Sequence, residues 1–154
     1  MCGPFLTVTS RRRGLIRFGK RLQGPCHAAL RVVLGVAQCF DGIQAVAQAA
    51  RQIQRSGTEI VCISLGTEVA VIVDGKDSYY CPAPKVRIYS TVGSGDAMVA
   101  GMVMASLLWR SVEELLRFGV ICGSATASHP GTELFTRAEV EEVEYELELR
   151  GLAI

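Results

Sequence analysis

From residue 41 onward, apolar positions recur with the period of an α-helix. Five apolar residues fall on one side of this pattern: Ile43, Val46, Ala47, Ala50 and Ile53. Glutamine and arginine residues occupy the other side, and Ser56-Gly57 ends the pattern with a glycine of the kind that follows a helix. The pattern predicts an amphipathic helix over residues 43–55.

Short runs rich in β-branched residues follow this helix. Residues 59–66 form an almost continuous apolar run that ends at Gly66, which is typical of a strand buried on both faces. Residues 69–73 and 78–81 flank a polar turn at 74–77 and predict a β-hairpin. After two prolines, residues 86–89 predict one more strand.

Three helices are predicted in the rest of the chain. Residues 97–109 are apolar over a helical length and include small residues, which predicts a buried, closely packed helix. The spacing of Ser111 and Glu114 is that of a capping box and opens a helix to about residue 128. Thr136 and Glu139 repeat this spacing and open a last helix to about residue 150. This order of elements predicts an α/β domain whose sheet is partly parallel.

The composition is that of a soluble globular protein. The chain has 154 residues, of which 49% are apolar and 20% charged, so it is long enough for one domain with a hydrophobic core. No stretch reaches the roughly 18 apolar residues that a membrane-spanning helix requires. We therefore expect no membrane partner.

Charge divides the chain near residue 40. Residues 1–40 contain seven Lys or Arg and no Asp or Glu, whereas residues 41–154 contain nine basic and 15 acidic residues. Such a start fits a transit peptide, a basic arm that touches nucleic acid or anionic lipid, or a disordered or frame-shifted lead-in to a domain over 41–154. We favour the lead-in and expect no nucleic-acid partner, because no aromatic residues alternate with the basic ones.

The six cysteines and two histidines predict neither a disulfide framework nor a metal site. No Cys-x-x-Cys pair occurs, and His27 and His129 are isolated in the sequence. Cys62 and Cys122 lie within apolar runs, where a reduced cysteine acts as a small core residue. This usage predicts a reducing, cytoplasmic location.

The candidate chemistry lies in residues 90–101, which read Ser-Thr-Val-Gly-Ser-Gly-Asp-Ala-Met-Val-Ala-Gly. Gly93 and Gly95 let the backbone turn and present successive N–H groups at a helix N-terminus, where an anion is favoured. Asp96, in the first turn of the same helix, is placed to accept a proton from a hydroxyl held beside that anion. The segment predicts a phosphate-binding turn with a neighbouring base.

Other glycine motifs do not fit these residues. A dinucleotide fingerprint would have a glycine at Met98, and a P-loop requires Gly-Lys-Ser/Thr, which is absent. A nucleophile elbow would require glycines two positions before and after Ser94, where Val92 and Asp96 stand. Gly-x-Gly-Asp by itself is a common sequence, so the surrounding segments decide the interpretation.

Four segments in order resemble the final portion of pfkB-type kinases of the ribokinase family. They read Val-Cys-Ile-Ser-Leu-Gly at 61–66, Pro-Lys-Val at 84–86, the glycine segment at 90–101, and Pro-Gly-Thr followed by Leu-Phe within 130–135. The similar branch contains fructose-1-phosphate kinase, tagatose-6-phosphate kinase and the minor 6-phosphofructokinase. The resemblance implies the C-terminal part of a ribokinase-like three-layer α/β/α fold, with a partly parallel sheet and a β-hairpin.

The resemblance also implies roles for individual residues. Asp96 corresponds to the base that activates a sugar hydroxyl for attack on the γ-phosphate of ATP, with Mg²⁺ neutralising the phosphates. The backbone amides of Gly93, Ser94 and Gly95 correspond to the anion hole. The residues that correspond to nucleotide contacts are Ser64, Leu65, Gly66 and Ser124. For Ser124, an ordinary helix serine bonded to its own backbone is the alternative.

Two departures from the family pattern bear on function. Val69 stands where the family's Ser-Leu-Gly-x-x-Gly loop has its second glycine, and the family's sugar-binding half has no counterpart. We expect ATP-dependent phosphorylation of a hexose phosphate such as fructose 1-phosphate. The alternative is an inactive nucleotide-binding remnant, because orienting both reactants is the main source of rate. Half of a doubly covered sheet would also expose an apolar face, which predicts self-association.

Overall fold

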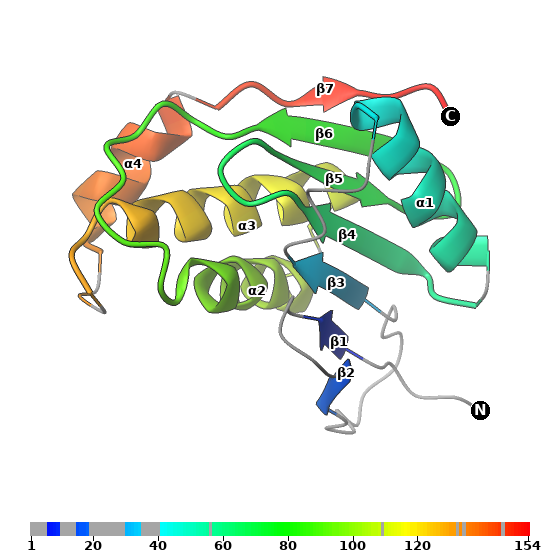
Figure 1. The fold of residues 1–154 in the computed structure, drawn as a ribbon, viewed down its shortest axis with the longest axis horizontal. Helices are drawn as coiled ribbons and strands as arrows, with labels where there is room; N and C mark the ends of the chain where they lie inside the picture. Colours follow the sequence, from blue (N-terminus) through cyan, green and yellow to red (C-terminus); the bar gives the residue numbers. More distant parts are fainter. Residues whose placement is uncertain are drawn as a thin grey trace. The chain divides into compact units, whose positions relative to one another are not determined.

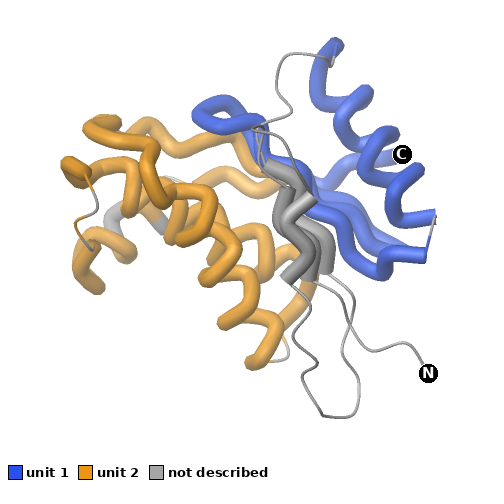
Figure 2. Tube along the Cα trace, turned by 60° about the horizontal axis from the view of Figure 1, so that its bottom comes forward, with its two compact units in different colours: residues 1–80, 151–154 blue, residues 81–150 orange. Residues whose placement is uncertain are grey.

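The computed structural model describes the backbone of residues 6–9, 15–18, 30–34, 41–55, 57–108, 110–131, 133, 135–145 and 147–154, with side chains from residue 41 onward except at 142, 144 and 145. The basic residues at 11–13, 20 and 21, the cysteines before residue 40, His27 and Trp109 lie outside this description. The chain divides into two compact units (Figure 2). Unit 1 contains residues 1–80 and 151–154, and unit 2 contains residues 81–150.

Seven strands form one sheet in the order β2-β1-β3-β4-β5-β6-β7 (Figure 1). Their bounds are Leu6–Thr9 for β1, Leu15–Phe18 for β2, Leu30–Leu34 for β3, Ile60–Ser64 for β4, Val69–Val73 for β5, Ser78–Pro82 for β6 and Arg150–Gly151 for β7. Strand β3 pairs in parallel with β1 and β4, whereas β1 with β2 and β4 with β5 are antiparallel. The predicted partly parallel sheet is confirmed, and the predicted hairpin corresponds to the adjacent strands β5 and β6.

Helix α1, Ile43–Arg55, packs against β4 and β5 and forms the core of unit 1 with them (Figure 1). The helix contributes its buried residues Val46, Ala47 and Ala50, as the apolar period predicts. Successive strand residues point to opposite faces, and all of Val61, Cys62 and Ile63 are buried. The predicted strand buried on both faces is therefore confirmed.

Three helices make up most of unit 2: α2, Ser94–Leu107; α3, Val112–Ala127; and α4, Arg137–Tyr145. Glycines bring α2 and α3 together, because a Cβ atom at Gly101 would lie 2.6 Å from the Phe118 carbonyl oxygen. A Cβ atom at Gly119 would lie 2.6 Å from Cγ of Met102. The small residues of this region therefore permit the predicted close packing.

Both predicted capping boxes are confirmed. The Ser111 hydroxyl accepts from the Glu114 amide at 3.2 Å, and the Glu114 carboxylate accepts from the Ser111 amide at 3.2 Å. At the start of α4, the Glu139 carboxylate accepts from the Thr136 amide at 2.5 Å, and the Thr136 hydroxyl accepts from the Glu139 amide at 3.4 Å. Each pair satisfies amides that a helix start leaves unbonded.

The predicted strand at 86–89 is wrong, since residues 83–91 form neither helix nor strand. The amides of Tyr89 and Ser90 donate instead to the carbonyl oxygen of Ala127 at the end of α3, at 2.9 and 3.3 Å. Pro82 and Pro84 have no amide to donate to a neighbouring strand. A helix end thus holds this segment, and the glycine turn does not follow a strand directly.

Two further predictions about helices are wrong, one about the end of α4 and one about the burial of α2. Helix α4 ends at Tyr145 and not near residue 150. The chain end joins the sheet because the Leu152 amide donates to the Ser78 carbonyl at 2.8 Å and the Leu152 side chain packs on the unit 1 core. Helix α2 is buried on one side only, since Met104 and Leu107 are 59% and 54% exposed. No helix in the described ranges is long and apolar enough to cross a membrane.

Candidate functional site

The segment that leads into α2 is attached to the end of α3. Beyond the two bonds to the Ala127 carbonyl, the hydroxyl of Ser90 accepts a hydrogen bond from the Val92 amide at 3.2 Å. This bond shapes a short turn in the manner typical of serine. The backbone is therefore fixed on both sides of Thr91, directly before Gly93.

Gly93 is the N-cap residue of α2 and has a φ of 82°. Residues with a Cβ atom avoid this left-handed region, so the turn requires glycine here. The Gly93 carbonyl accepts the first helical hydrogen bond, from the Ala97 amide at 2.8 Å. Gly95 lies within the first turn of the helix.

The amides of this first turn are available to a ligand. A helix start leaves its first amides without intrahelical partners, and no side chain caps α2. The Ser94 amide makes only a long contact with the Thr91 carbonyl, at 3.4 Å. Such amides, with the positive end of the helix dipole, favour an anion, and the role of Gly93, Ser94 and Gly95 as an anion hole stays a prediction.

Asp96 lies in the first turn of α2 and is exposed. Within the described part of the chain, no group forms an ion pair or hydrogen bond with its carboxylate. The carboxylate is therefore free to accept a proton from a bound hydroxyl beside the uncapped amides.

A buried hydroxyl without a partner lies in the same turn. The Ser94 side-chain oxygen is inaccessible to solvent and has no hydrogen bond. A buried polar atom of this kind costs about 1–3 kcal/mol unless something satisfies it. A bound anion or an ordered water at the turn would provide that partner.

Helix α3 positions this turn through Gly123 and Thr126, which were not among the residues predicted from the sequence. A Cβ atom at Gly123 would lie 3.1 Å from the Ser94 carbonyl oxygen, and one at Gly93 would lie 3.9 Å from Cγ2 of Thr126. A side chain at position 123 would therefore require the Ser94 carbonyl to shift by a few tenths of an ångström. The sequence did contain one signal for Gly123, which stands inside a helical pattern. Glycine there costs about 1 kcal/mol relative to alanine, so a close contact with a neighbouring segment would explain it.

Ser124 lies on α3 next to Gly123 and is half-buried. Its neighbours bond to the helix backbone: the Thr126 hydroxyl donates to the Cys122 carbonyl at 2.8 Å, and the Ser128 hydroxyl to the Ser124 carbonyl at 3.3 Å. The hydroxyl of Ser124 itself has no hydrogen bond among the described residues. Its role as a nucleotide contact stays a prediction.

Three predicted nucleotide contacts lie in unit 1. Ser64 ends β4, and the Leu65 amide donates to the Val69 carbonyl at 2.8 Å, which closes the tight connection to β5. Gly66 is exposed with a φ of 69°. The Val69 side chain is part of the unit 1 core. The structure thus places the glycine turn in one compact unit and this loop in the other.

The sequence of the chain matches the family model of pfkB family carbohydrate kinase over residues 27–138. The chain belongs to this family. It is 41% identical over 93 residues to 1-phosphofructokinase of Rhodobacter capsulatus, covering 60% of this chain and 29% of that protein. It is 37% identical over 99 residues to ATP-dependent 6-phosphofructokinase isozyme 2 of Escherichia coli, covering 64% of this chain and 32% of that protein.

The fold is similar to that of solved phosphofructokinases. The structure of phosphofructokinase-2 from Escherichia coli in complex with substrates and products matches with a TM-score of 0.66 and 32% identity, covering 74% of this chain and 40% of that one. These likenesses confirm the ribokinase-like α/β fold class. The chain spans about a third of the length of the curated relatives.

The family match includes residues 27–40, which belong to the predicted lead-in. Strand β3 lies in this stretch and pairs in parallel with β4 over five residue pairs. The domain division at residue 40 stays a prediction.

The described cysteines of this family member have core surroundings. Cys62, Cys81 and Cys122 are free thiols. Burial raises the pKa of Cys62 to about 12 and that of Cys81 to about 11, and it also raises the pKa of Cys122. High thiol pKa values disfavour the reactive thiolate. These three residues therefore act as packing residues.

Proposed function

We propose that this protein transfers the γ-phosphoryl group of ATP to a hydroxyl of a phosphorylated hexose such as fructose 1-phosphate. One observation carries the proposal: the free Asp96 carboxylate lies beside uncapped first-turn amides in a chain of the pfkB family. Phosphoryl transfer needs little beyond positioning, a proton acceptor and stabilisation of the developing charge.

In this proposal each group at the turn has one task. Asp96 accepts the proton of the attacking sugar hydroxyl as the new O–P bond forms. The amides of Gly93, Ser94 and Gly95 donate hydrogen bonds to the oxygens of the transferring group, on which negative charge accumulates.

The nucleotide is proposed to bind through Ser64, Leu65, Gly66 and Ser124. Because the Leu65 amide is already bonded to Val69, we assign the phosphate contact of this loop to Gly66. Ser124 carries a hydroxyl with no hydrogen bond among the described residues, which suits a contact to ribose or base. A cytoplasmic location and a homo-oligomer stay predictions.

Magnesium is proposed to arrive with ATP. The described side chains include no group of three or more His, Cys, Asp or Glu that could hold a metal ion. Mg²⁺ bound to nucleotide phosphates keeps several waters and needs at most one or two carboxylates, so the residues at this turn fit that mode. When bound, it neutralises phosphate charge and orients the leaving group.

Replacing Asp96 by Asn tests the proposal directly. With ATP, Mg²⁺ and fructose 1-phosphate in a coupled assay of ADP release, we expect Asp96→Asn to lower turnover by about 10²–10⁴-fold, the range typical of a general base. Nucleotide binding, measured by isothermal titration calorimetry, should remain. Glu113→Gln is the matched control, because Glu113 occupies the first turn of α3.

Two outcomes separate the candidate functions. Unchanged turnover in Asp96→Asn would refute the assignment of the base. If the unaltered protein binds ATP but turns over no sugar phosphate, the result supports the alternative of a nucleotide-binding protein without kinase activity.

A further inference from the structure

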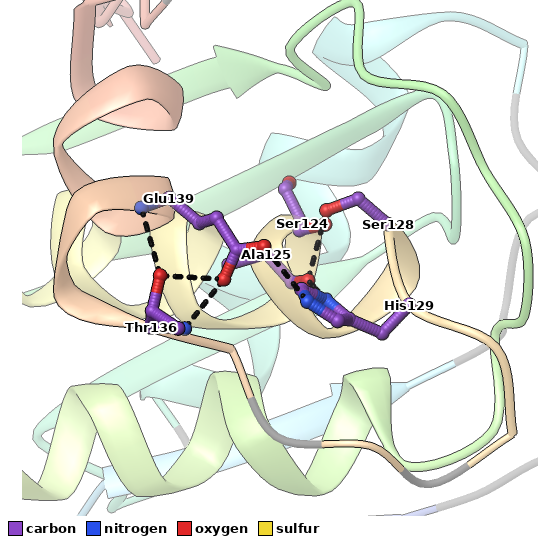
Figure 3. Close-up of polar contacts among 6 residues, drawn as sticks. All are labelled: Ser124, Ala125, Ser128, His129, Thr136 and Glu139. Atoms are coloured by element: carbon purple, nitrogen blue, oxygen red, sulfur yellow. Dashed lines mark hydrogen bonds and ion pairs between the residues drawn. The ribbon is translucent and has the colours of Figure 1, made fainter.

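The imidazole ring of His129 lies between two oxygen atoms at the end of α3 (Figure 3). Its Nδ1 is 2.9 Å from the Ala125 carbonyl oxygen, and its Nε2 is 2.9 Å from Oε1 of Glu139 on α4. A carbonyl and an ionised carboxylate only accept hydrogen bonds, while a neutral imidazole has a single N–H. Both contacts are hydrogen bonds only when the ring carries two protons. In either neutral tautomer, one ring nitrogen would turn its lone pair toward an oxygen.

The surroundings of the ring favour this charged form. The ring lies at the negative end of the α3 dipole, and its side chain is only 14% exposed. The hydrogen bond to Ala125 raises the pKa of His129, and the carboxylates of Glu139 and Glu133 raise it further, against the opposing effect of burial. Among the described residues, the charged groups that act on the ring are Glu139 on α4 and Glu133 in the connecting loop, and both are acidic.

Glu139 is held in place without the histidine. Its Oε2 accepts from the Thr136 amide at 2.5 Å and from the Thr136 hydroxyl at 2.8 Å, which leaves Oε1 for His129 (Figure 3). The hydrogen bonds from the Thr136 amide and hydroxyl lower the pKa of Glu139, and His129 lowers it further by a smaller amount. The carboxylate therefore stays ionised over the pH range in which the histidine loses its proton.

The same end of α3 supports the approach to the glycine turn. The Ala125 carbonyl, which the ring contacts, also accepts from the Ser128 hydroxyl at 2.9 Å. Two residues further on, the Ala127 carbonyl holds the amides of Tyr89 and Ser90. One helix end thus carries both the contact with α4 and the backbone that leads to Gly93.

We propose that His129 is a proton-sensitive positioning residue: its doubly protonated ring ties α4 to the end of α3, and loss of one proton loosens the segment that leads to Gly93. The effect on catalysis rests on the proposed function, whereas the structural coupling does not. An ordinary exposed ion pair contributes little and would leave the Tyr89 and Ser90 amides unaffected by titration.

The direction of the pH dependence follows from the two pKa shifts. Folding raises the pKa of His129 above 6.5, the ordinary histidine value. The contribution of the protonated ring to folding stability is therefore fully present below pH 6.5 and is lost as pH rises through the folded-state pKa. Folding lowers the pKa of Glu139 below 4.5, its ordinary value. The contribution of its carboxylate to folding stability is therefore present above pH 4.5 and is lost as pH falls through the folded-state pKa. The contact is therefore strongest between 4.5 and 6.5 and weakens as pH rises through the folded-state pKa of His129.

The first test is a titration of the ring nitrogens by ¹⁵N NMR in the full chain. His27 is the other histidine in the sequence, so His27→Gln assigns the signals. We expect His129 to titrate above 6.5 and Glu139→Gln to lower its pKa, because glutamine keeps the capping acceptor but removes the charge. Glu114→Gln is the matched control: it occupies the same capping position of α3 and should leave the titration unchanged.

The second test is hydrogen exchange at the Tyr89 and Ser90 amides, corrected for the intrinsic pH dependence of exchange. We expect their protection to fall several-fold as His129 loses its proton, and His129→Gln to abolish this dependence. A His129 pKa at or below 6.5, or constant protection of both amides across its titration, would overturn the proposal. Both readouts are independent of turnover, so their failure is distinct from a failure of the proposed kinase activity.

Discussion

At the scale of single residues, the glycine turn depends on one backbone conformation. Gly93 has a φ of 82°, and a Cβ atom there would meet Cγ2 of Thr126 only at an ordinary contact distance of 3.9 Å. Its requirement for glycine thus comes from the backbone angle and not from a lack of space. The position of the uncapped amides depends directly on that angle.

Gly93→Ala is expected to destabilise the protein by about 1–2 kcal/mol, the cost of a left-handed conformation for a residue with a Cβ atom. It should also weaken ATP binding, because relief of the strain would turn the first-turn amides away from the phosphates. Gly42→Ala is the matched control: Gly42 directly precedes α1, has a φ of 87° and meets nothing within 4 Å.

Urea unfolding followed by circular dichroism would measure the loss of stability, and calorimetry would measure binding. We expect Gly93→Ala and Gly42→Ala to lose the same amount of stability. Only Gly93→Ala should bind ATP more weakly. Unchanged ATP binding in Gly93→Ala would contradict the assignment of these amides to the phosphates.

At the scale of elements, the contact between α2 and α3 depends on glycines that lower helix propensity. Alanine is preferred over glycine inside a helix by about 1 kcal/mol, so packing must explain Gly101 and Gly119. At Gly101 the obstacle is the Phe118 carbonyl, which belongs to the helix backbone, whereas at Gly119 the nearest atoms belong to the Met102 side chain. The two glycines are therefore not equivalent.

Gly101→Ala is expected to destabilise unit 2 by about 1–3 kcal/mol despite the gain in propensity, because a backbone carbonyl cannot move without shifting α3. Gly119→Ala should cost less, since the obstacle there is the unbranched side chain of Met102 and not a helix backbone. Thermal and urea unfolding of the two variants would measure the difference. A Gly101→Ala protein as stable as the unaltered chain would contradict this account of the packing.

Several elements were predictable because their signals are local. The periodic apolar positions of α1 and the capping boxes that start at Ser111 and Thr136 act through contacts over three or four residues. The strand predicted at 86–89 failed because the Tyr89 amide bonds to the carbonyl of Ala127, nearly 40 residues later in the chain, and the Val86 amide to that of Pro84. A short apolar run contains no information about such a distant partner.

At the scale of the whole molecule, the first and the last residues of the chain belong to the same compact unit, unit 1. The chain leaves this unit after residue 80 and returns at residue 151. The Ser78 hydroxyl donates to the Leu152 carbonyl at 2.6 Å, and Leu152 packs against the core beneath α1. Residues 151–154 are thus part of unit 1, whose other elements come from the first 80 residues of the chain.

Leu152→Ala is expected to lower the stability of unit 1 by about 1–2 kcal/mol, because the half-buried side chain contributes less than a fully buried leucine. Ile154→Ala, at a side chain that is 42% exposed, is the matched control and should change stability by less than about 0.5 kcal/mol. Urea denaturation monitored by circular dichroism would measure both. Equal effects would show that Leu152 does not anchor the chain end.

The sequence by itself determined where helices α1 to α4 and strands β4, β5 and β6 lie, and that Asp96 stands in the first turn of a helix behind a glycine turn. These features depend on residues close together in the chain, and their spacing can be read from the amino-acid sequence. Only the tertiary structure showed that the end of α3 holds the approach to Gly93, that Gly123 lies against the turn, and that His129 faces two acceptors. The physical reason is that such contacts join residues far apart in sequence, and packing alone selects the partner of each donor and acceptor.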